Sequence, residues 1–202
     1  MSDPDREAGR ITAGDDLREV RERELATLEV PTLAPRAQQI VEVALELLEE
    51  GGPDAVSMRV VAGRLGVRAP SLYKHLPDKG AMENAMIAIG LRQQGAACEE
   101  GMRGADDPLT GVAQAFRRWG KEHRHLYELM MAAPLDPGPL VRSAELVAGR
   151  ALREAMQGDA VGAFTVWSFA HGLLSLELQD RLPPGADVEV LWARGIDALR
   201  PR

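Results

Sequence analysis

Apolar residues along this chain recur three or four positions apart, the spacing of amphipathic helices. The first regular stretch runs from Ala34 to Glu50, and the paired glycines Gly51 and Gly52 end it. Loops containing glycine or proline separate the later stretches. The pattern therefore predicts an all-α fold. Further long helical stretches are predicted over 79–102, 109–132, 140–156, 161–182 and 188–199.

Two shorter helices are predicted after the first. Ser57 is a good N-cap, and the apolar residues that follow it have helical spacing. Gly66 can adopt the positive φ that ends a helix tightly, and Pro70 suits the first turn of a second helix that reaches about His75. Pro77 then stops this helix. Two helices joined by a short turn with glycine match the helix-turn-helix unit, whose second helix enters the DNA major groove.

The charge of the chain is concentrated unevenly. The formal net charge is −7, yet residues 57–80 carry five Lys or Arg against one acid, a local balance of +4. The first 34 residues, by contrast, carry five bases and nine acids. An acidic total therefore does not exclude DNA binding, because the local basic patch supplies the attraction for phosphate.

Length and composition favour two domains and an extension. With 202 residues, 45% of them hydrophobic, the chain can bury a sizeable core. We expect a three-helix DNA-binding domain over 34–80 and a larger helical domain over 81–202. Residues 1–33 form a polar N-terminal extension, which is either a frayed tail or an extra helix lying on the DNA-binding domain or along the DNA backbone.

The stretch 161–182 is the most apolar of the predicted helices and is apolar on two sides. A helix of this kind must be covered on both sides. The economical interpretation is a subunit interface, in which the last two helices meet their copies in a four-helix bundle. The alternative is that both sides serve an intramolecular core. One stripe contains Phe164, Trp167, His171, Leu174 and Leu178, and the other contains Phe169, Leu173 and Leu176.

Several classes of protein are disfavoured. The single cysteine, Cys98, excludes an internal disulfide and a zinc site with two thiolates; it is either a partly buried small apolar residue or a redox-sensing thiol. The histidines His123, His125 and His171 lack the helical ligand spacing of a metal site, so we expect no enzyme, metal or cofactor. With no run of 18 apolar residues and no signal peptide at the first residues, we expect a cytoplasmic protein that does not span a membrane.

Two sequence blocks, SMRVVAGRLGV and RAPSLYKHLPDKGAM, follow a helix that ends in GG. In this order they closely resemble the N-terminal domain of TetR-family transcriptional regulators, over about residues 36–86. FRRWGKEHRHLYELMM and WSFAHGLLSLELQDRL resemble the C-terminal part of one TetR subclass more loosely. The resemblance implies a symmetric homodimer on a palindromic operator in double-stranded DNA. It also implies an effector-binding and dimerisation domain, and repression relieved by a small molecule.

The resemblance assigns DNA-contacting roles by matching position. Arg59 reaches either a base edge, where an Arg can be bidentate to guanine, or a phosphate. Lys74 can reach either target, and Ser57 is either a phosphate ligand or only a helix cap. Arg64 is better explained as a solvated charge. The positions that open the recognition helix and read bases are Arg68, Ala69, Pro70 and Ser71, whereas the phosphate-contacting positions are Tyr73, His75 and Lys79.

The effector site is expected among the C-terminal helices, where a mostly apolar pocket would carry a few polar groups. The same residues are also compatible with an ordinary core. An alternative function is a helical protein that binds a small molecule or a partner but not DNA, although the basic segment argues against it. The candidates by type and stripe are Phe116, Trp119, His123, Tyr127, Met130, Trp167 and His171.

Overall fold

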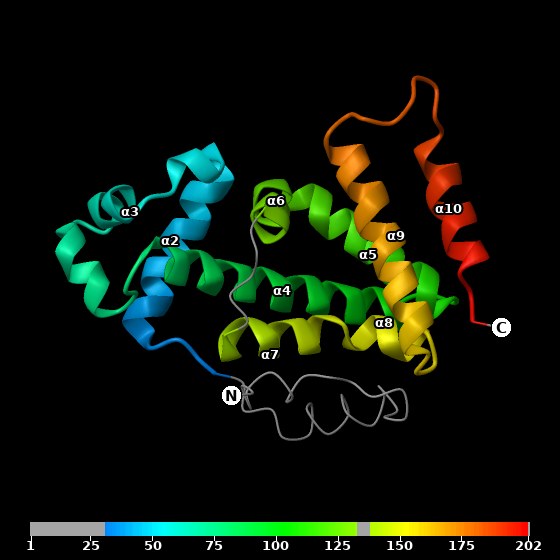
Figure 1. Ribbon diagram of the computed structural model, residues 1–202, viewed down its shortest axis with the longest axis horizontal. Helices are drawn as coiled ribbons and strands as arrows, with labels where there is room; N and C mark the ends of the chain where they lie inside the picture. Colours follow the sequence, from blue (N-terminus) through cyan, green and yellow to red (C-terminus); the bar gives the residue numbers. More distant parts are fainter. Residues whose placement is uncertain (1–30, 133–137, 202) are drawn as a thin grey trace, which may run out of the picture.

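The computed structural model describes residues 31–132 and 138–201, and this part of the chain contains helices and no strands. Residues 1–30, with most of the predicted N-terminal extension, lie outside the described ranges. Figure 1 shows two groups of helices joined by α4, which confirms the predicted all-α class. The elements in chain order are α2 (Pro35–Gly51), η2 (Pro53–Ala55), α3 (Met58–Arg64), η3 (Ala69–Lys74), α4 (Lys79–Arg103), α5 (Pro108–Glu122), α6 (Arg124–Ala132), α7 (Pro139–Ala148), α8 (Arg150–Ala155), α9 (Ala160–Leu178) and α10 (Val188–Ala198).

In the N-terminal domain α3 packs on α2, and η3 packs on α3. The Ser57 hydroxyl caps α3 by accepting the N–H of Val60 at 3.2 Å, and Gly66 takes a φ of +68° at the turn. Val60 itself is exposed, because the short helix turns only one face to α2. The core of this domain is formed by side chains that are at most 1% exposed, including Ile40, Leu48, Val61, Leu72 and Met82.

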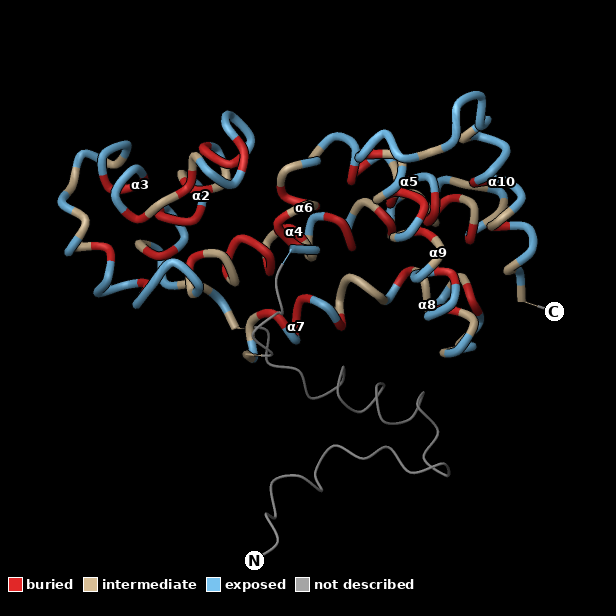
Figure 2. The backbone as a smooth tube through the Cα atoms, turned by 45° about the horizontal axis from the view of Figure 1, so that its top comes forward, coloured by how far each residue is buried: buried red, intermediate tan, exposed pale blue. Residues whose placement is uncertain are grey.

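Helix α4 connects the two domains. Asp78 caps it by accepting the N–H of Ala81 at 2.7 Å, and the helix then continues for 25 residues, roughly 37 Å at 1.5 Å per residue. It packs against α2 at one end and against α5, α6, α7 and α8 farther along. In Figure 2 the buried positions of α4 recur along its whole length. Movement of this helix therefore affects both domains.

Two stretches predicted as continuous are each divided in the structure. The stretch 109–132 breaks at His123, whose φ of −116° and ψ of 48° are not helical, so that α6 turns towards α2. The stretch 140–156 breaks at Gly149 into α7 and α8. Apolar spacing continues across both breaks, so the periodicity gives no sign of them. Tertiary packing against α2 and α4 decides where the axis changes direction.

The close approach of α4 and α5 requires two glycines. A Cβ on Gly101 would lie 2.6 Å from the carbonyl oxygen of Gly111 and 2.6 Å from the Cβ of Ala115, which is closer than real side chains allow. The two backbones can therefore pack together only because these positions carry no side chain.

An ion-pair network on Glu177 ties α10 to α5 and α9. The carboxylate of Glu177 accepts from Arg117 Nε at 2.9 Å, Lys121 Nζ at 2.8 Å and Trp192 Nε1 at 3.2 Å, while Arg117 also pairs with Glu189 at 2.8 Å. Burial alone would raise the pKa of Glu177, but these hydrogen bonds outweigh it and lower the pKa to about 2. The carboxylate thus remains ionised and holds α10 in place.

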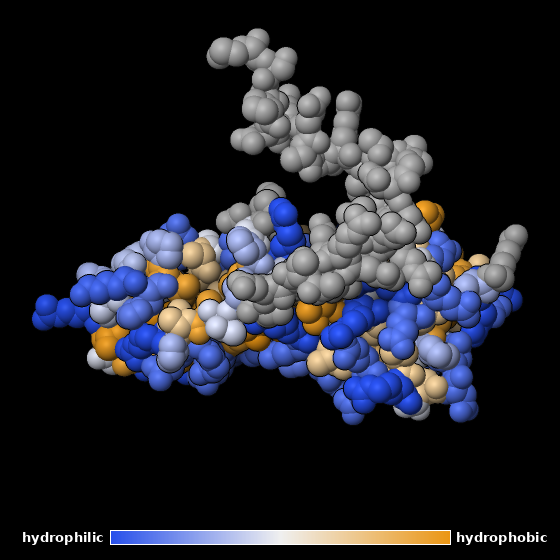
Figure 3. Space-filling view, turned by 90° about the horizontal axis from the view of Figure 1, so that it is seen from below, coloured by the Kyte–Doolittle hydropathy of each residue, from blue (hydrophilic) through white to orange (hydrophobic). Residues whose placement is uncertain are grey.

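One face of α9 and α10 lies open to solvent within the described chain. It carries large apolar side chains that protrude from both helices. The face seen in Figure 3, in contrast, is mainly hydrophilic with small hydrophobic patches. Helix α9 is also long and apolar enough to suit a membrane span, but a single helix of this kind is weak evidence, because core helices have the same properties. The exposed apolar residues of this face, here called the α9–α10 face, are Val161, Phe164, Trp167, Leu176, Val190 and Leu191.

Candidate nucleic-acid interface and ligand cavity

The second helix of the helix-turn-helix unit, η3, is a six-residue 3₁₀ helix that begins one residue before its predicted start. Its apolar side is anchored by Leu72 and by Leu76 just beyond its end, which are 1% and 5% exposed. Ala69 and Ser71 are half-buried, and the Ser71 hydroxyl donates to the carbonyl of Arg68 at 2.7 Å. The remaining predicted contact residues of this segment are exposed: Arg68, Pro70, Tyr73, Lys74 and His75.

The basic side chains of this unit differ in their partners. Arg64 forms a two-pronged ion pair with Glu50, with nitrogen–oxygen distances of 3.1 and 2.6 Å. Within the described ranges, Arg59, Arg68 and Lys74 form no ion pair, and their side chains are open to solvent. A two-pronged pair holds the Arg64 guanidinium more firmly than a single contact would, so we expect Arg64 not to contact DNA.

Lys79 and Ser57 lie at helix N-termini. Lys79 is the first residue of α4 and makes a 3.0 Å ion pair with Glu83 one turn later. The Ser57 hydroxyl oxygen caps α3, while its proton is free to be donated to a phosphate. Both alternatives for Ser57 therefore remain compatible with its geometry.

A cavity of about 740 Å³ lies among α4 to α9 and is referred to here as the large cavity. Most of its lining is apolar. Four of the seven predicted effector residues line it: Phe116, Met130, Trp167 and His171. Sequence reasoning missed the contributions of α7 and α8, and also the α4 stripe of Ile87, Leu91, Gln94 and Cys98. The helical spacing of this stripe, with one amide among apolar residues, could have revealed it.

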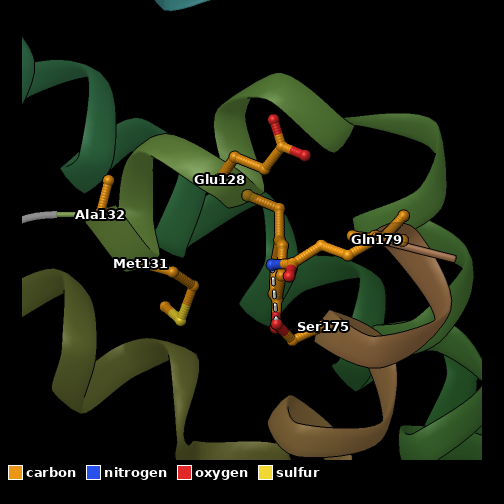
Figure 4. A pocket seen from close by; sticks show the side chains of 7 residues that line it. Glu128, Met131, Ala132, Ser175 and Gln179 are labelled. Atoms are coloured by element: carbon orange, nitrogen blue, oxygen red, sulfur yellow. Dashed lines mark hydrogen bonds between the residues drawn. The ribbon is translucent and has the colours of Figure 1, made fainter. Parts of the chain in front are cut away.

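The other three predicted residues do not line the large cavity. Trp119 is buried beside His123, with ring centroids 5.1 Å apart. His123 faces the N-terminal domain, where its Nδ1 lies 3.7 Å from a carboxylate oxygen of Glu49. Tyr127 lines a smaller cavity of about 370 Å³ between α6 and the end of α9, seen in Figure 4 together with the Gln179–Ser175 hydrogen bond.

His171 is the polar centre of an aromatic cluster. Its ring lies 4.8 Å from Phe116 and 4.5 Å from Trp167 between centroids, and its Nδ1 is 3.0 Å from the Tyr127 hydroxyl. Burial lowers the pKa of His171 to about 4 and raises that of Tyr127 to about 12. Both groups are therefore uncharged at neutral pH.

Cys98 is a neutral thiol in the wall of the large cavity. Burial raises its pKa to about 12, and its exposed fraction is 5%. Because the thiolate is the reactive form, this environment favours the interpretation as a buried apolar residue. The described residues also contain no group of three or more His, Cys, Asp or Glu arranged to hold a metal ion.

Two parts of the chain match models of known protein families. Residues 40–86 match the family model for bacterial regulatory proteins of the tetR family, and residues 109–199 match the model for the tetracyclin repressor-like C-terminal domain. An HTH-type transcriptional regulator of Mycobacterium tuberculosis is 28% identical over 156 residues, which are 70% of this chain and 69% of that protein. The class D tetracycline repressor of Escherichia coli is 39% identical over 82 residues, but these are only 40% of this chain and 38% of the repressor.

A solved structure shows the same fold over most of the chain. The TetR transcriptional regulator from Rhodococcus sp. RHA1 superposes with a TM-score of 0.61, covering 81% of this chain and 96% of that one, at 21% identity. At 21% identity this structural similarity is evidence for the fold alone. The family models, which together extend over both domains, carry the assignment further: the chain belongs to the TetR family of transcriptional regulators.

Proposed function

We propose that this protein is a dimeric, ligand-responsive repressor that binds a palindromic operator through η3 and is released by a small molecule in the large cavity. The observation that carries the proposal is the exposed, basic surface of residues 57–80, held on a rigid core and joined by α4 to a cavity. The related tetracycline repressors, as their name says, are repressors. Binding to chromosomal DNA implies a cytoplasmic location.

The proposed DNA contacts divide by chemistry. Arg59 and the residues that open η3 (Arg68, Ala69, Pro70 and Ser71) would face base edges, since direct readout concentrates at the start of a recognition helix. Phosphates would be held by Tyr73, His75 and Lys79, with Lys74 able to reach either target. In η3, Ser71 already donates to a backbone carbonyl, so its oxygen is available mainly as an acceptor.

A dimer formed through the α9–α10 face would match the two-fold symmetry of a palindrome. A symmetric dimer places the same surface of each subunit in contact, which suits two helices with protruding apolar side chains. Two copies of α9 and α10 would form a four-helix bundle and cover side chains such as Phe164, which is 67% exposed in the single chain. Two recognition helices would then lie about 34 to 36 Å apart, one turn of DNA.

The connection between cavity and DNA runs through α4 and α6. Helix α4 contributes Ile87 and Gln94 to the cavity and begins at Lys79. Helix α6 contributes Met130 to the cavity and lies close to α2, with His123 near Glu49 at the junction. A ligand that fits only one arrangement of these helices would shift the spacing of the two recognition helices. We therefore expect effector and operator to bind antagonistically.

Selection of bound fragments from the source genome tests the DNA-binding function and yields an operator. The full-length protein should enrich a palindromic sequence, which a gel-shift assay then quantifies. Replacing Tyr73 and Lys79 together by Ala should abolish the shift while circular dichroism remains unchanged. Full affinity in this double variant would contradict the assigned roles. Failure of the intact protein to enrich any sequence would favour the alternative, a helical binding protein that does not act on DNA.

A further inference from the structure

The polar groups of the large cavity limit the chemistry of its occupant. Gln94 is 7% exposed, and its side-chain amide nitrogen is buried without a hydrogen-bond partner among the described residues. Buried amide nitrogens are almost always paired, because leaving the donor unsatisfied is unfavourable. Gln94 is one of the residues that line the cavity, so a turn of its side-chain amide would let this nitrogen donate to an acceptor atom on a bound molecule.

No buried charge faces this cavity from the described residues. None of the charged residues in its lining is fully buried: Arg142 and Glu145 are exposed, and Arg153 is half-buried, with its guanidinium donating to the carbonyl of Leu146 at 2.6 Å. His171 and Cys98 are uncharged at neutral pH. A charged group carried into the interior of the cavity would lose its hydration without gaining a buried counter-ion.

The aromatic rings that line the cavity favour a flat partner. Phe116 and Trp167 both contact His171, with Phe116 edge-on to the imidazole and Trp167 tilted against it. Rings in these orientations can receive a further aromatic ring in stacked or edge-to-face contact. The volume of about 740 Å³ suits a drug-sized molecule.

We propose that the large cavity binds an uncharged, mostly apolar aromatic molecule with an acceptor oxygen, to which the Gln94 amide nitrogen donates a hydrogen bond. The inference rests on the proposed function in one respect, which is that this molecule is the effector that releases the operator. Gln94 is then a specificity-determining residue: it selects an oxygen-bearing ligand over a hydrocarbon of similar shape. An anionic ligand would depend instead on Arg142 or Arg153, the two guanidinium groups in the lining.

Three fluorescent probes distinguish these chemistries on the full-length protein. Nile red is neutral and aromatic with a carbonyl oxygen, diphenylhexatriene is neutral without an acceptor, and anilinonaphthalene sulfonate is anionic. Each is titrated by its fluorescence increase into the wild type and into Gln94→Met, which keeps the side-chain volume and removes the donor. Gln93→Met is the matched control, since Gln93 is the exposed neighbour on the same helix. Ala163→Phe, which places a ring in the cavity, measures the dye bound elsewhere on the protein.

The expected result is a Kd for Nile red that rises about tenfold in Gln94→Met and is unchanged in Gln93→Met. The Kd for diphenylhexatriene should change less than about twofold in either variant, because a hydrocarbon accepts no hydrogen bond. Absence of cavity-dependent Nile red binding, or an unchanged Kd in Gln94→Met, would overturn the proposal. So would tighter binding of the sulfonate than of Nile red, with that affinity lost in Arg142→Gln or in Arg153→Gln. The titrations contain no DNA, so their outcome is independent of operator binding. The dye result can contradict the ligand proposal while the protein still binds an operator, and the dyes can bind as expected while the protein binds no operator.

Discussion

Replacing Lys79 by Gln is expected to weaken operator binding and to reduce its salt dependence. The Lys79 side chain is half exposed, and its ion pair with Glu83 joins two partly exposed groups on successive turns of α4. Such a pair contributes about 0.3–0.5 kcal/mol, less than the roughly 1.5–3 kcal/mol of a hydrogen bond to a charged group. Lys79 can therefore leave Glu83 for a phosphate. Each phosphate contact contributes about 0.9 to the magnitude of the slope of log K against log salt. Loss of one contact per subunit should therefore reduce that magnitude by about 1.8 for the dimer.

The measurement is fluorescence anisotropy of labelled operator between 50 and 200 mM salt, the range over which counterion release is conventionally measured. Arg64→Gln is the matched control, because it removes the same charge from a side chain already paired with Glu50. It should leave the slope within about 0.3 of the wild type, well below the change of about 0.9 for one phosphate contact. An unchanged slope in Lys79→Gln, or an equal loss in Arg64→Gln, would refute the assignment of phosphate contacts by exposure and pairing.

Three further predictions concern stability and assembly. Leu72→Ala should lower the free energy of unfolding of the DNA-binding domain by roughly 2–5 kcal/mol in chemical denaturation, because this side chain is 1% exposed; a loss below about 1 kcal/mol would contradict its place in the core. The folded-state pKa of His171 is depressed to about 4, so the unfolded chain takes up the proton first as the pH falls. The free energy of unfolding should therefore decrease by up to about 3 kcal/mol as the pH drops from about 6.5 to 4. His171→Gln should flatten that dependence in urea titrations, whereas exposed His75→Gln should not. Leu176→Glu on the α9–α10 face should yield monomers in sedimentation velocity, whereas Met131→Glu, equally exposed on α6, should remain dimeric.

Most helices, their caps and the helix-turn-helix unit could be predicted from local patterns. Ser57 caps its helix as expected, and Gly66 takes the positive φ that its turn requires. Capping and tight turns depend on residues a few positions apart, so the sequence carries their signals directly. The breaks at His123 and Gly149 could not be predicted, because the apolar spacing runs through both and only the packing of neighbouring helices bends the chain there.

The candidate site was predicted unevenly for a similar reason. The exposure of Tyr73 and the burial of Leu72 follow from a short helix with one apolar side. The ligand cavity depends on helices that are distant in sequence. Selection by residue type and helical stripe therefore included Trp119 and His123, which pack elsewhere, and passed over Gln94.

The sequence by itself determined the all-helical class, the order of the helices and the basic bias of residues 57–80, because periodicity, capping and charge are properties of neighbouring residues. Only the tertiary structure decided which charges and polar groups are free to bind. Arg64 is paired with Glu50 and His171 with Tyr127, although the partners are 14 and 44 positions apart, while the Gln94 amide is left unpaired in the cavity. The physical reason is that side-chain partners are set by how the helices cross and how closely their backbones approach, and that geometry is a property of the whole packed core.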